Sequence, residues 1–191
     1  MNGFVDIVLV LYRMKFEIRT GVFGGTFDPI HRAHIRIASY VRREFRLARV
    51  IFVVAGRPPH KRSDRASPRD RLAMVRAAIR GRRGLVASDF EIRSRGKSYT
   101  HRTLAALRKR YGRSSRLLLI VGEDQARVLS TWKSPRRIAA LADIIVVRRG
   151  SARGAIRVAP YFRFHVSRFP PTPVSSTVFR DRVSDLLAGP Q

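Results

Sequence analysis

The sequence predicts an α/β fold, with a mostly parallel β-sheet covered by helices on both faces. Short apolar runs rich in β-branched residues alternate with helical patterns from one end of the chain to the other. Two expected helices also have clear starts. Ser67 and Ser134 can cap them, and each is followed by a proline, which needs no amide donor at the first helical position. Such alternation forms right-handed crossovers, and these build a parallel sheet with helices above and below it.

The elements follow one another in a regular order. The expected strands are Ile18 to Phe23, Val50 to Val54, Leu85 to Ile92, Leu117 to Val121 and Ile144 to Val147. The expected helices are Ala33 to Phe45, Pro68 to Ile79, His101 to Arg110, Gln125 to Leu129, Pro135 to Ala142 and, after a rigid proline stretch, about Ser176 to Leu187. Ligands of such sheets bind outside the carboxyl ends of the strands, so function is expected in the loops that follow them.

The composition restricts the chemistry. The length of 191 residues suits one domain, and the absence of cysteine excludes disulfides, thiolate metal sites and cysteine nucleophiles. The 40 basic and 13 acidic residues give a net charge of +27, which favours contact with polyanions. The arginines are scattered through every segment rather than clustered, so no specific nucleic acid partner is expected.

The first residues, Met1 to Leu11, form an apolar run that lacks the basic segment and cleavage site of a signal peptide. The run is also too short to span a bilayer. We therefore expect a cytoplasmic protein with no membrane partner. Met14 offers a second start, so residues 1–13 are predicted to be a dispensable extension or a start-site artefact, and residues 14–191 a single domain.

The loop after the first expected strand has the features of an anion site. Gly24 and Gly25 remove side chains, so that backbone amides can come close to a phosphate, and the next helix adds its N-terminal partial charge. His31 and His34 are three residues apart, which places both rings on one face of the first helical turn. Either motif alone is more often a glycine turn or a pair of surface histidines, but their joint position favours phosphate binding.

Two further segments suggest phosphate contacts. In the run Ser175 to Arg180, hydroxyls can cap a helix and bind phosphate oxygens, with a guanidinium one turn later. The run Pro58 to Lys61 is a stiff loop that holds a cation after the second expected strand. A plain capped helix and a solvated lysine are the alternatives.

With these motifs, the chain resembles the bacterial nicotinate-nucleotide adenylyltransferase family. That family belongs to the nucleotidyltransferase superfamily with HxGH and SSTxxR-type signatures, whose fold is Rossmann-like. The resemblance covers nearly the whole chain from Lys15 onward and rests on Gly24 to His34, Pro58 to Lys61, Arg71, Met74, Glu91, Ser98 to Thr100, Gly122, Asp124, Trp132 and Ser175 to Arg180.

The resemblance implies transfer of the AMP part of ATP to the phosphate of nicotinate mononucleotide, with release of pyrophosphate, a step of NAD biosynthesis. It gives His31, His34 and Arg180 catalytic contacts with the ATP phosphates. The implied substrate-binding residues are Gly24, Gly25, Thr26, Lys61, Tyr99, Thr100, Gly122, Asp124, Trp132, Ser175, Ser176 and Thr177. Among them, Asp124 would bind sugar hydroxyls, while an aromatic pair and a threonine would build the nicotinate pocket: Tyr99, Trp132 and Thr100.

This reaction needs alignment and charge neutralisation more than a strong base, because the attacking phosphate oxygen is already ionised at neutral pH. Imidazole, guanidinium and Mg²⁺ can neutralise charge on the α-phosphate and on the leaving pyrophosphate. Magnesium prefers water and substrate phosphates to protein cages, so Mg²⁺ is expected mainly on the ATP phosphates and no protein metal ligand is assigned. His31 and His34 could form half of a zinc site, but no third ligand stands out.

The chain departs from the family pattern at three positions, and other functions compete with the one that the resemblance implies. Ala33 stands where the family has glycine, Glu123 where a small residue is usual, and Val174 where isoleucine is common; these bear on affinity more than on reaction type. A pantetheine-phosphate adenylyltransferase typically has threonine at the position of His31, and a class I aminoacyl-tRNA synthetase is longer. A basic RNA-binding protein with decayed catalysis stays open, although no stacking platform is evident. Nicotinate is favoured over its amide, and a homo-oligomer is left open.

Overall fold

The computed structural model describes residues 18–58, 66–112, 115–148 and 155–170 of the chain. A six-stranded sheet runs through them in the order β3-β2-β1-β4-β5-β6. Every neighbouring pair of strands is parallel, as expected from the alternation of strands and helices. The strand order reverses between β1 and β4, and this reversal opens a crevice beyond the carboxyl ends of the two strands.

The bounds of the elements are as follows. The strands are β1 (Ile18–Gly25), β2 (Arg49–Val54), β3 (Leu85–Ser88), β4 (Ser115–Gly122), β5 (Ala142–Val147) and β6 (Phe164–Val166). The helices are α2 (Arg32–Glu44), α3 (Pro68–Ile79), α4 (Phe90–Arg93), α5 (Thr100–Tyr111), α6 (Glu123–Arg127) and α7 (Pro135–Leu141), with the short 3₁₀ helix η1 at Leu129–Thr131.

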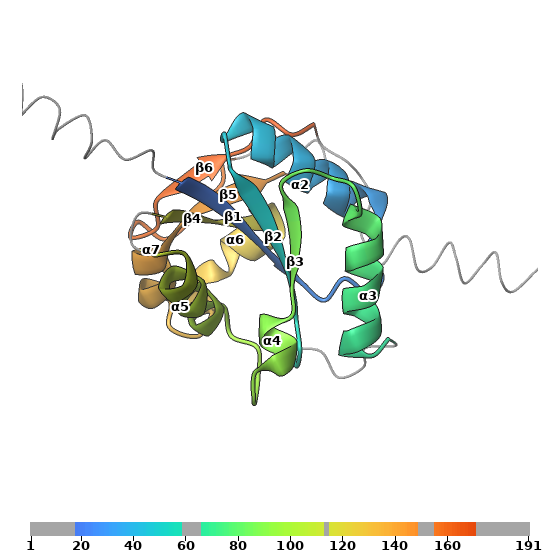
Figure 1. Cartoon of the computed structure of the whole chain (residues 1–191). Helices are drawn as coiled ribbons and strands as arrows, with labels where there is room; N and C mark the ends of the chain where they lie inside the picture. The colour runs from blue at the N-terminus through green and yellow to red at the C-terminus, as the bar shows by residue number, and fades with distance from the viewer. Residues whose placement is uncertain (1–17, 59–65, 113–114, 149–154, 171–191) are drawn as a thin grey trace, which may run out of the picture.

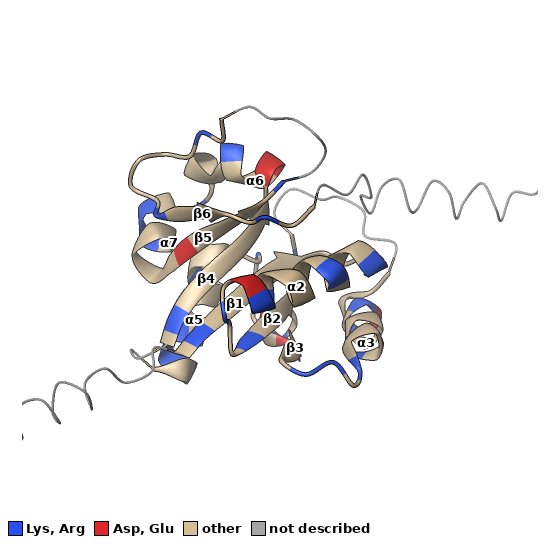
Figure 2. Cartoon of the chain, turned by 90° about the horizontal axis from the view of Figure 1, so that it is seen from above, with Lys and Arg blue, Asp and Glu red and all other residues tan. Residues whose placement is uncertain are grey.

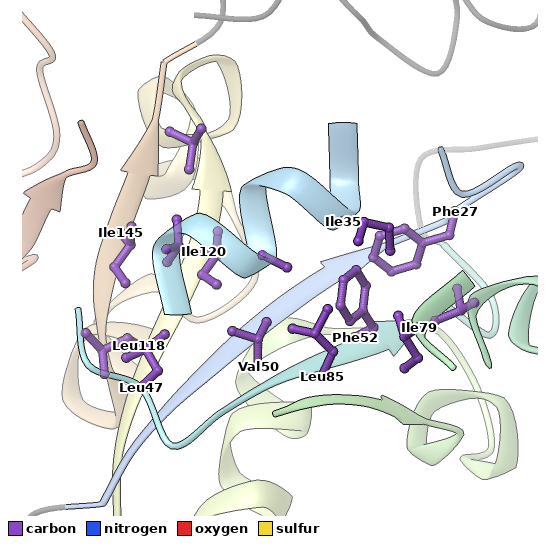
Figure 3. Close-up of a cluster of buried hydrophobic side chains, with 14 of the residues drawn as sticks. Phe27, Ile35, Leu47, Val50, Phe52, Ile79, Leu85, Leu118, Ile120 and Ile145 are labelled. Carbon is purple, nitrogen blue, oxygen red and sulfur yellow. The ribbon is translucent and has the colours of Figure 1, made fainter. Parts of the chain in front are cut away.

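Two apolar cores lie on the two faces of the sheet. Alternate residues of β2 divide between them: Phe52 points to the core under α2 and α3, while Ile51 and Val53 point to the core under α5, α6 and α7. Figure 1 shows the helices on both faces. Figure 3 shows the first core, where Phe52 of β2 lies beneath Ile35 of α2 and Val50 lies further along the same strand. The predicted three-layer architecture is confirmed.

One predicted strand is partly wrong. We expected a strand over Leu85 to Ile92, but β3 ends at Ser88 and residues Phe90–Arg93 form α4. The Ser88 hydroxyl oxygen accepts a hydrogen bond from the Phe90 amide at 3.3 Å, which turns the chain out of the sheet. This turn places the backbone of Glu91 against Gly56, where a Cβ would lie 2.3 Å from the Glu91 carbonyl oxygen.

The two predicted helix caps differ in outcome. The Ser67 hydroxyl accepts from the Asp70 amide at 3.2 Å, so the cap of α3 is confirmed. Helix α7 begins at Pro135 as predicted, but Ser134 makes no side-chain cap hydrogen bond and has φ of 56°. In this left-handed conformation the hydroxyl does not reach the first amides of the helix, so the capping prediction was wrong there.

Other parts of the sequence prediction changed in extent. The helix expected at Gln125 to Leu129 is observed as α6, which begins earlier at Glu123, followed by η1. Strand β6 was not predicted, because it has only three residues and all are exposed. The last expected helix, about Ser176 to Leu187, lies outside the described residues, as does the extension 1–13.

Among the described residues, lysine and arginine are not gathered on a single face. Figure 2 shows lysine and arginine on helices of both faces of the sheet, including α2, α3 and α5.

A buried carboxylate links the last three strands, because Asp143 of β5 pairs with Arg116 of β4 and, at 3.0 Å, with the Nε of Arg163 just before β6. None of the helices in the described segments has the length and apolar character needed to cross a membrane.

Candidate active site

A cavity of about 140 Å³ lies beyond the carboxyl ends of β1, β2 and β4, where the strand order reverses. It brings together four of the predicted substrate-binding residues: Gly24, Gly25, Thr100 and Trp132. The remaining lining residues come from β1, β2 and β4, from the loop after β2, from α4, and from α5 with the segment before it: Val22, Val53, Ala55, Pro58, Glu91, Ser98, Thr103, Leu119, Ile120 and Val121. Its apolar walls and few polar groups are typical of a small-molecule site.

The two glycines at the end of β1 have different reasons to be glycine. A Cβ at Gly24 would meet no protein atom within 4 Å, so the protein leaves open space there. A Cβ at Gly25 would lie 2.9–3.2 Å from the ring of Phe27. Phe27 has φ of 51°, and this left-handed turn folds its buried ring back over Gly25. Gly24 is therefore the position where a ligand can approach the backbone.

The two histidines lie together at the start of α2. Their rings stack with centroids 3.8 Å apart and an angle of 27° between the planes, so the predicted shared face is confirmed. His34 also meets the rings of Phe23 and Phe27 edge-on, with centroids 5.9 and 5.2 Å away. The pair follows the glycine loop directly, although neither ring lines the cavity itself.

A backbone hydrogen bond sets the tautomer of His34. The His31 amide donates to Nδ1 of His34 at 3.3 Å. Because Nδ1 accepts, the neutral ring carries its proton on Nε2. His34 thus presents an N–H donor on the side of the ring away from the backbone, and a phosphate oxygen is a suitable acceptor for it.

The loop is anchored from beneath by Arg71 of α3, which is fully buried. Its Nη1 donates to the carbonyl oxygens of Thr26 at 2.7 Å and Ala55 at 2.9 Å, and its Nε donates to that of Ala66 at 3.2 Å. One guanidinium therefore joins the ends of β1 and β2 to the start of α3. Arg71 is among the residues that carry the family resemblance, but no sequence pattern indicated its role.

The start of α5 forms another wall of the site. The Ser98 hydroxyl oxygen accepts from the amides of Gly56 at 3.0 Å and Arg57 at 3.1 Å, so the loop after β2 is tied to the segment before α5. Tyr99 is the residue at the cap of α5 and does not line the cavity, whereas Thr100 does. Tyr99 stacks instead on His101, with ring centroids 5.8 Å apart.

Glu91 is a polar residue that lines the cavity. It is one of the residues that carry the family resemblance, but the sequence did not predict a role for it. Burial raises the pKa of its carboxyl group, and hydrogen bonds from Thr103 and Ser98 partly offset this effect. The Thr103 hydroxyl donates to Oε1 at 2.5 Å. One signal was available: an acidic residue inside the apolar run after Leu85 is either solvent-exposed or, as here, a partnered buried carboxyl.

Two further predicted substrate-binding residues lie outside the cavity. Gly122 ends β4 and Asp124 lies in the first turn of α6, both at the carboxyl edge of the sheet but outside the cavity lining. Glu123 is buried and its Oε1 pairs with Arg127 at 2.6 Å, which explains how a large residue is accommodated. Ala33 is buried as well. Five predicted site residues lie outside the described part of the chain: Lys61, Ser175, Ser176, Thr177 and Arg180.

The described residues also bear on metal binding. They contain no group of three histidine, cysteine, aspartate or glutamate side chains placed to hold a metal ion. Two carboxylates already have partners, since Glu91, which lines the cavity, binds Thr103 and Glu123 binds Arg127. The donor set of imidazoles and backbone amides suits phosphate, and a divalent cation would fit here as a companion of that phosphate.

The chain is similar to known proteins over most of its length. Residues 22–182 match the family model described as "Cytidylyltransferase-like". A protein of Desulfatibacillum aliphaticivorans named "Probable nicotinate-nucleotide adenylyltransferase" is 44% identical over 150 residues, covering 76% of this chain and 68% of that protein. A protein of the same name from Desulfitobacterium hafniense is 36% identical over 180 residues, covering 87% and 84%. Three further relatives are covered over 61–64% of their length.

A solved structure has the same fold. Nicotinic acid mononucleotide adenylyltransferase of Plasmodium falciparum complexed with NaAD superposes with a TM-score of 0.67, covering 84% of this chain and 78% of that one. Its sequence identity of 15% means that this likeness bears on the fold alone.

Proposed function

Because the chain belongs to the nicotinate-nucleotide adenylyltransferase family, within the cytidylyltransferase-like group, we propose that it transfers AMP from ATP to nicotinate mononucleotide. The products are nicotinate adenine dinucleotide and pyrophosphate, and the reaction serves NAD biosynthesis in the cytoplasm. The observation that carries this proposal is the stacked His31 and His34 pair, placed directly after an open glycine position at the reversal point of the sheet.

The phosphates of ATP bind along the loop from Gly24 to the start of α2. The open position at Gly24 lets the chain's amides approach them, and the helix N-terminus favours their negative charge. The Nε2–H of His34 donates to a phosphate oxygen and is held in place by its stacked neighbour and by Phe27. Donors fixed in this way stabilise charge that develops during transfer, which is the main catalytic requirement of the reaction.

Residues beyond the described part of the chain complete the phosphate site. Arg180 neutralises charge on the leaving pyrophosphate, supported by Ser175, Ser176 and Thr177, and Lys61 adds a further cation. Magnesium, carried mainly by the ATP phosphates, supplies additional neutralisation when bound. Thr26 helps to hold the phosphates. Asp124, in the first turn of α6, binds the sugar hydroxyls, and Gly122 at the end of β4 adds to the substrate site.

The nicotinate ring enters the cavity between Thr100 and Trp132, which both line it. Amides near Tyr99 and Thr100 receive the pyridine carboxylate, and Trp132 covers the ring. The amide of nicotinamide must place an NH₂ donor against protein donors, and one such mismatch costs about 1–3 kcal/mol. We therefore expect nicotinate mononucleotide to be preferred roughly tenfold to a hundredfold.

The proposal is tested by measuring pyrophosphate release with ATP, Mg²⁺ and, in separate reactions, nicotinate mononucleotide, nicotinamide mononucleotide and pantetheine phosphate. The expected ranking of kcat/KM places nicotinate mononucleotide first. A ratio near one for the two mononucleotides contradicts the nicotinate pocket, and a preference for pantetheine phosphate contradicts the family reaction proposed here.

Two variants test the assigned roles. Arg180→Ala and His34→Ala should each lower kcat about 10²–10³-fold, because each removes a donor that acts on developing charge. The matched control is His165→Ala on β6, an exposed histidine on the last strand of the sheet. Turnover in the control should stay within about twofold of the unaltered chain. Unchanged turnover in Arg180→Ala or His34→Ala would remove that residue from the site.

A further inference from the structure

His101, the second residue of α5, has a contact that the proposed mechanism does not use. Its ring is buried, and Nδ1 lies 3.1 Å from the carbonyl oxygen of Lys133. A carbonyl oxygen can only accept, so Nδ1 must carry the proton and donate it. The ring does not line the cavity, although its neighbour Thr100 does.

The carbonyl that His101 holds belongs to the residue after Trp132. Only Trp132, Lys133 and Ser134 separate η1 from α7, so this connection has little slack. Its ends are fixed by backbone bonds, since the Trp132 amide donates to Leu129 at 3.2 Å and the Ser134 carbonyl accepts from Arg137 at 3.1 Å. The hydrogen bond from His101 fixes the middle of the connection against α5.

We propose that His101 is a positioning residue, which sets the depth of Trp132 in the cavity and thereby the affinity for the mononucleotide without touching either substrate. The inference rests on the proposed function, because Trp132 meets the pyridine ring only if a pyridine mononucleotide is the substrate. It concerns two walls of one cavity: Thr100 on α5 and Trp132 after η1, which this hydrogen bond holds at a fixed separation.

The surroundings of His101 suit this role. Tyr99 stacks on the ring with an angle of 24° between the planes, which restricts its rotation. Burial lowers the pKa of His101, and the hydrogen bond to the Lys133 carbonyl partly offsets this effect. The nearby cations Arg137, Arg102 and Lys133 act in the same direction as burial, so the net shift is downward. The ring is therefore kept neutral near pH 7, with its proton on Nδ1, and the bond to Lys133 persists.

The chain offers a direct reporter, because Trp132 is its one tryptophan. His101→Asn retains a donor close to the position of Nδ1, whereas His101→Leu has a similar shape and no donor. His165→Leu on β6 is the matched control for loss of a histidine. Each variant is compared with the unaltered chain by acrylamide quenching of Trp132 fluorescence and by the KM values for nicotinate mononucleotide and ATP.

In His101→Leu we expect the KM for the mononucleotide to rise about fivefold, which corresponds to about 1 kcal/mol, the usual net strength of one hydrogen bond. The KM for ATP and kcat should stay within about twofold, quenching of Trp132 should increase, and His101→Asn should recover most of both effects. A general loss of fold in His101→Leu would instead alter both KM values and kcat. In that case His101→Asn tests the proposal, because it should keep the KM for the mononucleotide and the quenching of Trp132 close to those of the unaltered chain.

Three results would overturn the inference: equal changes in the two KM values, unchanged quenching in His101→Leu, or no recovery in His101→Asn. Failure of the proposed function is distinguishable from these. If the unaltered chain uses no pyridine mononucleotide, the proposed function fails, together with the claim about affinity. Quenching measured without substrate then shows whether His101 positions Trp132. Equal quenching in His101→Leu and His101→Asn would overturn the positioning of Trp132 as well.

Discussion

Replacing Arg71 by methionine should destabilise the protein strongly. The guanidinium is fully buried and donates to the carbonyl oxygens of Thr26, Ala55 and Ala66 at 2.7, 2.9 and 3.2 Å. Methionine has a comparable apolar stem but no donor. Three carbonyl groups that now receive charged hydrogen bonds from a fully buried guanidinium would lose that donor.

The magnitude follows from these three bonds. A buried group left without its partner costs about 1–3 kcal/mol, and breaking a buried charged network costs about 3–5 kcal/mol. We therefore expect the free energy of unfolding to fall by about 3–5 kcal/mol, which for a chain of this size lowers Tm by roughly 6–20 °C. Arg71→Lys keeps the charge but cannot span all three acceptors, so its loss should be intermediate.

Urea unfolding followed by circular dichroism measures these differences. Arg76→Met is the matched control, because Arg76 lies on the same helix with its side chain exposed. Its free energy of unfolding should change by less than about 0.5 kcal/mol. If Arg71→Met proved as stable as Arg76→Met, the three hydrogen bonds would not anchor the phosphate loop, and the reasoning from burial would be refuted.

Three other predictions concern the loop, the buried carboxyl group and the extension. Gly25→Ala should lower the unfolding free energy by about 1–3 kcal/mol, because the added methyl group collides with the Phe27 ring. Gly24→Ala should leave stability unchanged and raise the KM for ATP, because the methyl group enters the space left for the ligand. The reverse pattern would contradict the geometry. Burial raises the pKa of Glu91, so the folded protein loses stability as pH rises through that pKa. Glu91→Gln should therefore gain more unfolding free energy, relative to the unaltered chain, at pH 7 than at pH 4. A difference that does not depend on pH would count against this. A chain beginning at Met14 should match the full chain in Tm and turnover, and a large drop would show that the extension packs on the core.

Much of the fold could be predicted because its signals are local. The buried strands are short apolar runs, and the glycine loop with its two histidines stands directly after the first of them. Strand β3 shows the limit of this approach. Residues 85–92 are mostly apolar, so the pattern does not reveal the end of the strand at Ser88, which depends on a hydroxyl accepting from the Phe90 amide.

The parts of the site that sequence reasoning did not predict depend on tertiary contacts. Arg71 meets Thr26, which is 45 positions away, and His101 meets Lys133, which is 32 positions away. No periodicity or spacing connects such pairs before the sheet brings them together. Arg71 and Glu91 are among the residues on which the family resemblance rests. However, only their burial and hydrogen bonds indicate what these side chains do.

The central claim is that this crevice transfers AMP from ATP to nicotinate mononucleotide, and the fate of labelled ATP tests it most directly. With ATP labelled at the α-phosphate, the label should appear in the dinucleotide, and with ATP labelled at the γ-phosphate it should appear in pyrophosphate. Both products should form in equal amounts and only when the mononucleotide is present. Release of the α-label as free AMP, or appearance of the γ-label on the mononucleotide, would contradict the account.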